Sequence, residues 1–310
     1  TGPDLAHEPT LRALVRDMAE LSQRELRVEP MLGVEASGLD ASMPQPHRQP
    51  MPRQMRNPAD ADDVLGTVRE TSPHELQLAL QAAQDIAPKW AHTPPEQRAA
   101  MLDQAADLLQ ALSPRCMALL VREAGKTWSH AVAELREAVD FLRYYAAQVR
   151  RDFDGDTHVP LGPVVCISPW NFPLAIFMGQ VAAALAAGNP VLAKPAEQTP
   201  AVAALAVEVL WRAGVPRAAV QLLPGSGREV GQALVEDARV QGVMFTGSTE
   251  TAKRLQAVLA QRVNGQGSVV HLIAETGGQN CMVVDSSALL EQVVQDAVAD
   301  AMTVEAVPAV

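Results

Sequence analysis

Most of the information about the architecture of this chain comes from one segment, Ser168-Pro169-Trp170-Asn171-Phe172-Pro173. It directly follows a short apolar run, residues 164–167, and so has the position of a turn at the end of a buried strand. Two further segments follow apolar runs in the same way: Phe245-Thr246-Gly247-Ser248-Thr249-Glu250 and Glu275-Thr276-Gly277-Gly278. Three such motifs in one order are far harder to produce by chance than one glycine-rich loop.

Apolar runs of strand length alternate with helical stretches from residue 160 onward. The runs are residues 164–167, 191–193, 220–223, 243–245 and 269–273. This alternation is typical of βαβ units, which bury a parallel sheet between helices on both of its faces. We therefore predict an α/β protein with a Rossmann-type parallel sheet. A ligand binds at the carboxyl ends of such strands, so Asn171, Lys194, Ser248 and Glu275 are expected to line one crevice.

The N-terminal part is expected to contain a short helix and a linker. Residues 3–27 carry Leu11, Leu14 and Met18 at helical spacing, and this amphipathic helix has little to pack against on its own. Residues 30–56 are rich in proline and show no periodicity, which is linker composition. The clearest boundary in the chain is therefore expected there.

A helical region is predicted between the linker and the sheet, over residues 57–157. Ser113 is expected to be the N-cap of one helix, with proline at its first position, and Gly125 is expected to end it. A longer helix is predicted over residues 129–150. The apolar residues of this region recur at helical spacing, so these helices are expected to bury one face.

Composition restricts the possible functions. The chain has 310 residues, of which 48% are hydrophobic, so it has ample material for a core. Its formal net charge of −11 argues against a nucleic-acid partner, because a phosphate backbone requires a basic surface. The three cysteines, Cys116, Cys166 and Cys281, favour neither a disulfide framework nor a metal site. No leader or membrane-spanning segment is evident, and the expected location is cytoplasmic.

The three motifs resemble those of the aldehyde dehydrogenase superfamily. Residues 122–127, 161–167, 194–200 and 273–278 further resemble the L-glutamate γ-semialdehyde (Δ1-pyrroline-5-carboxylate) dehydrogenase half of the proline utilization A enzymes. The resemblance implies an NAD-dependent oxidation of a small-molecule substrate, L-glutamate γ-semialdehyde, to L-glutamate in proline catabolism. It also implies two catalytic residues: Glu275 as general base and Asn171 as hydrogen-bond donor to the developing oxyanion.

The resemblance implies a set of NAD-binding residues around the same crevice. They are Ile167, Ser168, Pro169, Trp170, Lys194, Ala196, Glu197, Gly225, Gly247, Ser248, Thr276 and Gly277. The residues themselves support part of this set, because a strand–Gly–Ser–helix junction directs backbone N–H groups at a pyrophosphate. A carboxylate at Glu197 favours NAD over NADP by repelling a 2′-phosphate. Without the resemblance, a strand–Gly–Ser–helix junction is more often only a turn and a cap. The alternative for Lys194 and Glu197 is a solvated ion pair at the end of a strand.

The chain is expected to lack the family's nucleophilic cysteine, which the resemblance places beyond the Glu275 motif. An extended chain would put Cys281 out of hydrogen-bond reach of Glu275, and both Cys281 and Cys166 belong to apolar runs and are expected in the core. Residues 303–310 depart from the family pattern, so a truncated or frame-disrupted product is expected, with most of the catalytic domain and the oligomerisation flap missing.

These expectations combine into a domain division and a set of functions. Residues 1–29 would be a remnant of an inter-domain helical segment and 30–56 a linker. Residues 57–286 would be an NAD-binding domain, with a helical part to 157 and a sheet part from 158, and 287–310 the start of the catalytic domain. The favoured function is the semialdehyde dehydrogenase of the family, inactive in this chain alone. The alternatives are a noncatalytic NAD-binding fragment and a dehydrogenase for another aldehyde.

Overall fold

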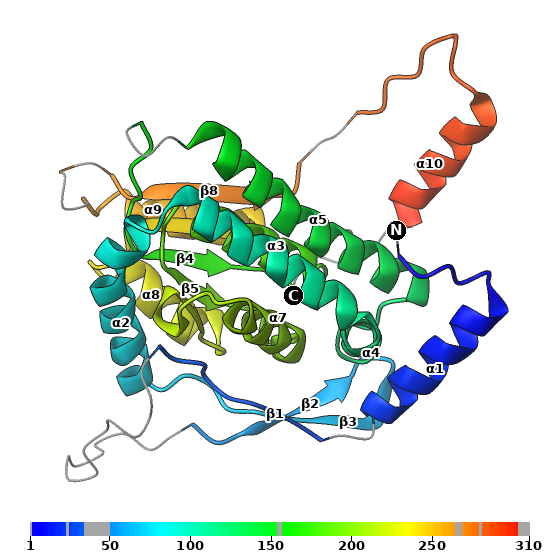
Figure 1. Ribbon diagram of the computed structural model, residues 1–310, viewed down its shortest axis with the longest axis horizontal. Helices are drawn as coiled ribbons and strands as arrows, with labels where there is room; N and C mark the ends of the chain where they lie inside the picture. Colours follow the sequence, from blue (N-terminus) through cyan, green and yellow to red (C-terminus); the bar gives the residue numbers. More distant parts are fainter. Residues whose placement is uncertain are drawn as a thin grey trace.

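The computed structural model describes residues 2–22, 25–33, 50–153, 157–263, 267, 269–278 and 281–302. Its centre is a five-stranded parallel sheet with the strand order β6-β5-β4-β7-β8. Figure 1 labels β4, β5 and β8 of this sheet. The strands are β4 (Val164–Ile167), β5 (Val191–Lys194), β6 (Val220–Leu222), β7 (Gly242–Gly247) and β8 (His271–Thr276). All five predicted strands are confirmed. The order reverses at β4, which opens a crevice at the carboxyl ends of β4 and β7.

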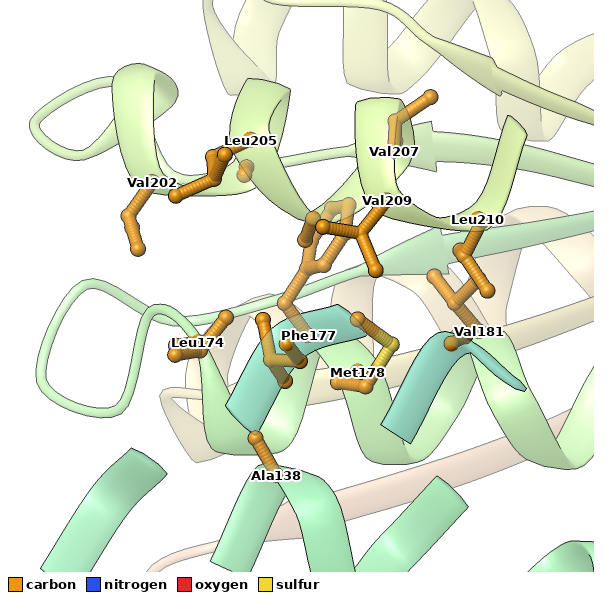
Figure 2. Packing of buried hydrophobic residues seen from close by; sticks show 14 of the residues in the cluster. Ala138, Leu174, Phe177, Met178, Val181, Val202, Leu205, Val207, Val209 and Leu210 are labelled. Atoms are coloured by element: carbon orange, nitrogen blue, oxygen red, sulfur yellow. The ribbon is translucent and has the colours of Figure 1, made fainter. Parts of the chain in front are cut away.

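Each face of this sheet carries its own hydrophobic core. Side chains alternate along the strands, so Val164 and Cys166 face one core, whereas Val165 faces the other. One face is covered by α2 (Pro73–Ala91), α8 (Gln232–Glu236) and α9 (Thr249–Leu259). The opposite core is built by α3 (Pro95–Ala111), α4 (Ser113–Ala124), α5 (Trp128–Asp152), α6 (Ala175–Ala186) and α7 (Pro200–Arg212). Figure 2 shows α6 and α7 meeting there, with Phe177 of α6 among the valines and leucines of α7.

The helix limits follow from local signals. Ser72 caps α2, and Glu75 closes a capping box by accepting the Ser72 N–H at 2.9 Å. Gly125 ends α4 in the left-handed conformation, with φ +65°, as predicted. The predicted N-cap of α4 is wrong by one residue: the cap is Leu112, and the Ser113 hydroxyl donates back to the carbonyl of Gln110 instead of accepting a helix N–H. The long helix predicted over residues 129–150 is α5.

A second, three-stranded sheet lies outside the central one and was not predicted. It has the order β1-β3-β2 and consists of β1 (Leu26–Val28), β2 (Arg53–Asn57) and β3 (Asp60–Val68). The predicted helical region therefore begins only at Pro73. The β2–β3 hairpin forms where the Asn57 side chain accepts the N–H of Ala59 at 2.9 Å, in an Asx turn next to proline. Most of the proline-rich stretch, residues 34–49, lies outside the described residues.

The N-terminal helix does have a partner. Helix α1 (Glu8–Ser22) packs against α4 and buries Leu14 and Met18, so the amphipathic face that an isolated helix would leave bare is covered here. A π-helical turn, Gly227–Gly231, precedes α8, and a 3₁₀ turn, Arg217–Ala219, precedes β6.

The end of the described chain leaves the body of the molecule. Residues 281–289 form no regular structure apart from a turn and lead to α10 (Leu290–Met302), which stands apart in Figure 1. The prediction that Cys281 is a core residue is wrong, because Cys281 and the apolar residues after it are exposed. Its apolar run resembles a strand but has nothing to pair with among the described residues. Residues 303–310 lie outside the described residues. No described helix is both long enough and apolar enough to span a membrane.

Candidate functional site

A cavity of about 790 Å³ opens at the carboxyl ends of the parallel strands. It brings together Asn171, Lys194, Ser248 and Glu275, the four residues expected to share a crevice. The predicted residues that line it are Glu275, Asn171, Ser168, Pro169, Trp170, Lys194, Ala196, Glu197, Gly247, Ser248, Thr276 and Gly277. The volume lies within the range typical of ligand pockets, roughly 300–1,000 Å³.

Two predicted site residues, Ile167 and Gly225, do not line this cavity. Ile167 is the last residue of β4, and its carbonyl accepts from the Gln180 side chain at 3.2 Å. Gly225 has φ +154°, and a Cβ there would lie 2.4 Å from the Val230 side chain. The glycine is therefore required by the tight turn before the π-helical turn.

The wall that carries Asn171 is the loop between β4 and α6. No side chain of its own caps α6, and the cap comes from α5: the buried Glu134 carboxylate accepts the N–H groups of Leu174 at 2.8 Å and Ala175 at 3.3 Å. The other carboxylate oxygen lies 2.7 Å from the ammonium of Lys126. That ammonium also lies 4.0 Å from the centre of the Phe172 ring, next to Asn171.

The wall that carries Lys194 and Glu197 is the loop between β5 and α7. Here too the helix is capped from outside: Glu123, at the end of α4, accepts the N–H groups of Ala201 at 2.7 Å and Val202 at 2.9 Å. Glu123 and Lys126 therefore stand on the same turn and support the two walls of the cavity. This explains the structural role of the 122–127 motif, to which the sequence analysis assigned no function.

The charged residues of this wall are held in defined positions. Lys194 is buried, and its ammonium donates to the carbonyl of Pro195 at 2.9 Å. Burial lowers the pKa of Lys194 to about 8, although the carboxylates of Glu197 and Glu70 act in the opposite direction. The Glu197 carboxylate accepts the N–H of Gly227 at 2.9 Å.

The third side of the cavity is the start of α9. Strand β7 ends at Gly247 and α9 begins at Thr249, as the motif predicted. The Ser248 side chain caps this helix by accepting the Thr251 N–H at 3.2 Å. Ser248, Thr249 and Thr251 all line the cavity, so the positive end of the α9 dipole is directed at it.

Strand β8 supplies the fourth side. Its register pairs Glu275 with Thr246 and Thr276 with Gly247. Glu275 therefore lies beside the end of β7, shortly before the turn that leads into α9. Glu275 is exposed at the mouth of the cavity. The buried Gln180 of α6 joins the neighbouring strand β7 to β4, since its amide donates to the Thr246 hydroxyl at 3.0 Å as well as to the Ile167 carbonyl.

Several lining residues had no predicted ligand role: Glu137, Phe172, Ile176, Gln198, Gly227, Phe245, Thr246, Thr249 and Thr251. Glu137 is the one with chemical significance, because it adds a third carboxylate to the lining besides Glu197 and Glu275. It comes from α5, and burial together with the charge of Glu134 raises its pKa. Nothing in its local sequence distinguishes Glu137 from a solvated helix residue, since only the packing of α5 beside α6 places it there.

Neither a thiol nor a metal cluster belongs to this cavity. None of the three cysteines lines it. The prediction that Cys166 is a core residue is confirmed, and Cys116 is buried as well. Burial raises the pKa of both thiols, that of Cys116 to about 12. Within the described residues, no three His, Cys, Asp or Glu side chains are grouped so that they could hold a metal ion.

Comparison with known proteins identifies relatives of this arrangement. The bifunctional protein PutA of Klebsiella aerogenes is 56% identical over 300 residues, 97% of this chain and 22% of that protein. The 1-pyrroline-5-carboxylate dehydrogenase of Bacillus cytotoxicus is 41% identical over 257 residues, 79% of this chain and 50% of that enzyme. The chain therefore spans less than a quarter of the length of the PutA protein.

Solved structures show the same likeness. A 1-pyrroline-5-carboxylate dehydrogenase superposes with a TM-score of 0.84 at 32% identity, covering 98% of this chain and 60% of its own. The Thermus 1-pyrroline-5-carboxylate dehydrogenase, solved with bound NAD, has a TM-score of 0.77 at 33% identity, covering 88% of this chain and 54% of its own. Residues 47–305 match the model of the aldehyde dehydrogenase family, and with these relatives the match shows that the chain belongs to that family.

Proposed function

We propose that this chain forms the NAD-binding part of an enzyme that oxidises L-glutamate γ-semialdehyde to L-glutamate in proline catabolism. The observation that carries the proposal is the cavity at the carboxyl edge of the sheet. It places an amide (Asn171), an exposed carboxylate (Glu275), a helix N-terminus (Ser248) and an acid–lysine pair (Lys194 and Glu197) around one space. Similarity to PutA and to 1-pyrroline-5-carboxylate dehydrogenases supports the substrate.

The residues of the cavity fit NAD. The Ser168 hydroxyl lines the cavity and is buried without a hydrogen-bond partner among the described residues, so a bound ligand would supply the partner that it lacks. Backbone N–H groups at the start of α9 would hold the pyrophosphate. Lys194 and Glu197 would bind the hydroxyls of the adenosine ribose, and Glu197 would repel a 2′-phosphate. NAD, when bound, supplies a hydride acceptor.

The remaining groups would act on the aldehyde. The Asn171 amide would donate to the oxygen that gains negative charge, and one such preorganised donor typically contributes about 3–4 kcal/mol. Glu275 would hold or remove a proton as general base. Glu137, on the Asn171 side, would pair with the α-ammonium group of a glutamate-like substrate, since it is the carboxylate there that the other roles leave unused.

A second candidate function is NAD binding without turnover by residues 1–310 alone. The placement of the cysteines favours it: covalent aldehyde oxidation needs a thiolate beside Asn171 and Glu275, and none of the three cysteines lines the cavity. The two candidates share the NAD site and differ in whether this chain completes the reaction.

Calorimetric titration with NAD and NADP tests the shared part. Wild-type chain is expected to bind NAD more tightly than NADP, and Glu197→Ala is expected to weaken NAD binding more than NADP binding. Glu208→Ala is a matched control, because Glu208 on α7 lies outside this cavity and makes only a 3.8 Å ion pair with Arg115. If Glu197→Ala lowers the affinity for NAD and for NADP by the same factor, the Glu197 carboxylate does not bind the ribose hydroxyls.

A further inference from the structure

Two residues of the outer hairpin reach the wall that holds Lys194 and Glu197. Arg53 lies on β2, and Glu70 follows β3. The Arg53 guanidinium donates to the main-chain carbonyl of Glu197, and its Nε lies 3.8 Å from Glu70 Oε1. A contact across 144 residues of sequence thus ties the hairpin to the loop between β5 and α7.

Glu70 lies next to the turn that follows β6 and contacts the loop of Glu197. A Cβ added to Gly225 would be 3.7 Å from Glu70 Oε2, so the carboxylate stands against the turn before Gly227, the residue whose N–H binds Glu197. Its negative charge also acts on the buried ammonium of Lys194. Neither Glu70 nor Arg53 lines the cavity, so both act on it through other residues.

The four side chains Arg53, Glu70, Lys194 and Glu197, hereafter the ribose-edge cluster, have no formal net charge when all are ionised. Arg53 pairs with Glu70, and the charges of Glu70 and Glu197 act on Lys194. Two of the four groups come from the hairpin and the residues directly after it, outside the central sheet. Any change in one hairpin charge therefore leaves an unbalanced charge beside the position proposed for the adenosine ribose. A nucleotide with a 2′-phosphate senses such a charge more strongly than one with a free hydroxyl.

We propose that Arg53 and Glu70 are positioning residues of the nucleotide site: Arg53 fixes the loop of Glu197, and Glu70 balances Lys194 so that the site rejects a 2′-phosphate. This rests on the proposed NAD site. It predicts that removing Glu70 and removing Arg53 shift the ratio of the NAD and NADP dissociation constants in opposite directions. A purely structural role of the two residues would not produce this result. Loss of Glu70 leaves a net positive cluster, whereas loss of Arg53 leaves a net negative one.

The test measures dissociation constants for NAD and NADP with the full chain and its variants. Glu70→Gln is expected to tighten NADP binding by about threefold to fivefold with little change for NAD, the size typical of one partly exposed charge. Arg53→Gln is expected to weaken both nucleotides, and NADP more than NAD. The conservative Glu70→Asp keeps the charge and is expected to retain the wild-type ratio of the two constants.

A control variant, Glu208→Gln, removes a carboxylate from an ion pair of the same 3.8 Å length whose residues do not line the cavity, and it is expected to leave the ratio unchanged. Circular dichroism confirms that each variant is folded. If wild type binds NAD preferentially but Glu70→Gln and Arg53→Gln shift the ratio in the same direction or not at all, the role of the hairpin is refuted while the proposed site stands. If folded wild type binds no NAD, both fail.

Discussion

The buried carboxyl of Glu123 supports the Lys194 wall of the cavity, and its pKa gives a test of that support. This side chain is 4% exposed, and its two oxygens accept the first free N–H groups of α7. Burial raises the pKa of Glu123 from 4.5 to about 7, although both hydrogen bonds and the charge of Arg53 oppose the shift. The desolvation of the carboxylate therefore outweighs the stabilisation it receives from the helix.

A raised pKa makes the stability of the fold depend on pH with a defined sign. Between pH 4.5 and about 7 the folded chain retains a proton that the unfolded chain has released. The contribution of Glu123 to stability is therefore fully present below pH 4.5 and is lost as the pH rises through 7. The shift corresponds to about 3 kcal/mol, because one pKa unit is equivalent to about 1.4 kcal/mol.

Glu123→Gln removes this titration and keeps one acceptor for the helix. The free energy of unfolding of the variant, taken relative to wild type, is expected to rise by about 3 kcal/mol between pH 4.5 and 8. Urea denaturation followed by far-ultraviolet circular dichroism, repeated across that range, measures the difference and cancels all other titrations. A difference that stays constant over this pH range would show that the pKa of Glu123 is not raised in the folded chain. A difference that falls would show that the hydrogen bonds to α7 lower the pKa instead.

Three further outcomes are expected. Lys126→Met leaves the buried Glu134 carboxylate without its counter-ion and should cost about 3–5 kcal/mol in urea denaturation; an unchanged midpoint would contradict the role of this pair. Gly66→Ala should destabilise the chain by more than about 2 kcal/mol in the same assay, because its Cβ would lie 1.9 Å from the Leu26 carbonyl oxygen at φ +147°, and a neutral effect would disprove that close approach. The chain is expected to produce no NADH from NAD and glutamate semialdehyde, and turnover that Cys281→Ala abolishes would show that this exposed thiol is the nucleophile.

The central sheet could be predicted because its signal is local. Each strand is a continuous apolar run, as expected for strands buried on both faces, and each motif follows directly after one. The hairpin around Asn57 lacks this signal: β2 is largely exposed and polar, and β3 begins with acidic residues. Its strands are specified by the turn at Asn57 and by contacts with distant elements, such as the ion pair of Asp63 with Arg122 of α4.

The site shows the same division. The residues that follow strands, such as Asn171 and Ser248, could be located from the pattern, because parallel strands end at one edge. Glu137, Glu70 and Arg53 could not, since each reaches the site from an element that is remote in sequence. Cys281 was misjudged for the converse reason: its run is apolar, but burial requires a packing partner, and the described residues provide none.

The turn between α4 and α5 also has a mechanical consequence. Glu123 and Lys126 flank Gly125, and through them one short segment holds the N-termini of both α6 and α7. The Asn171 wall and the Lys194 wall of the cavity thus share one anchor. A displacement of that anchor carries both walls in the same direction and preserves the gap between them, whereas movement of a single wall requires breaking buried hydrogen bonds. The gap between these two walls of the cavity is therefore expected to be stiff, even though loops form both of them.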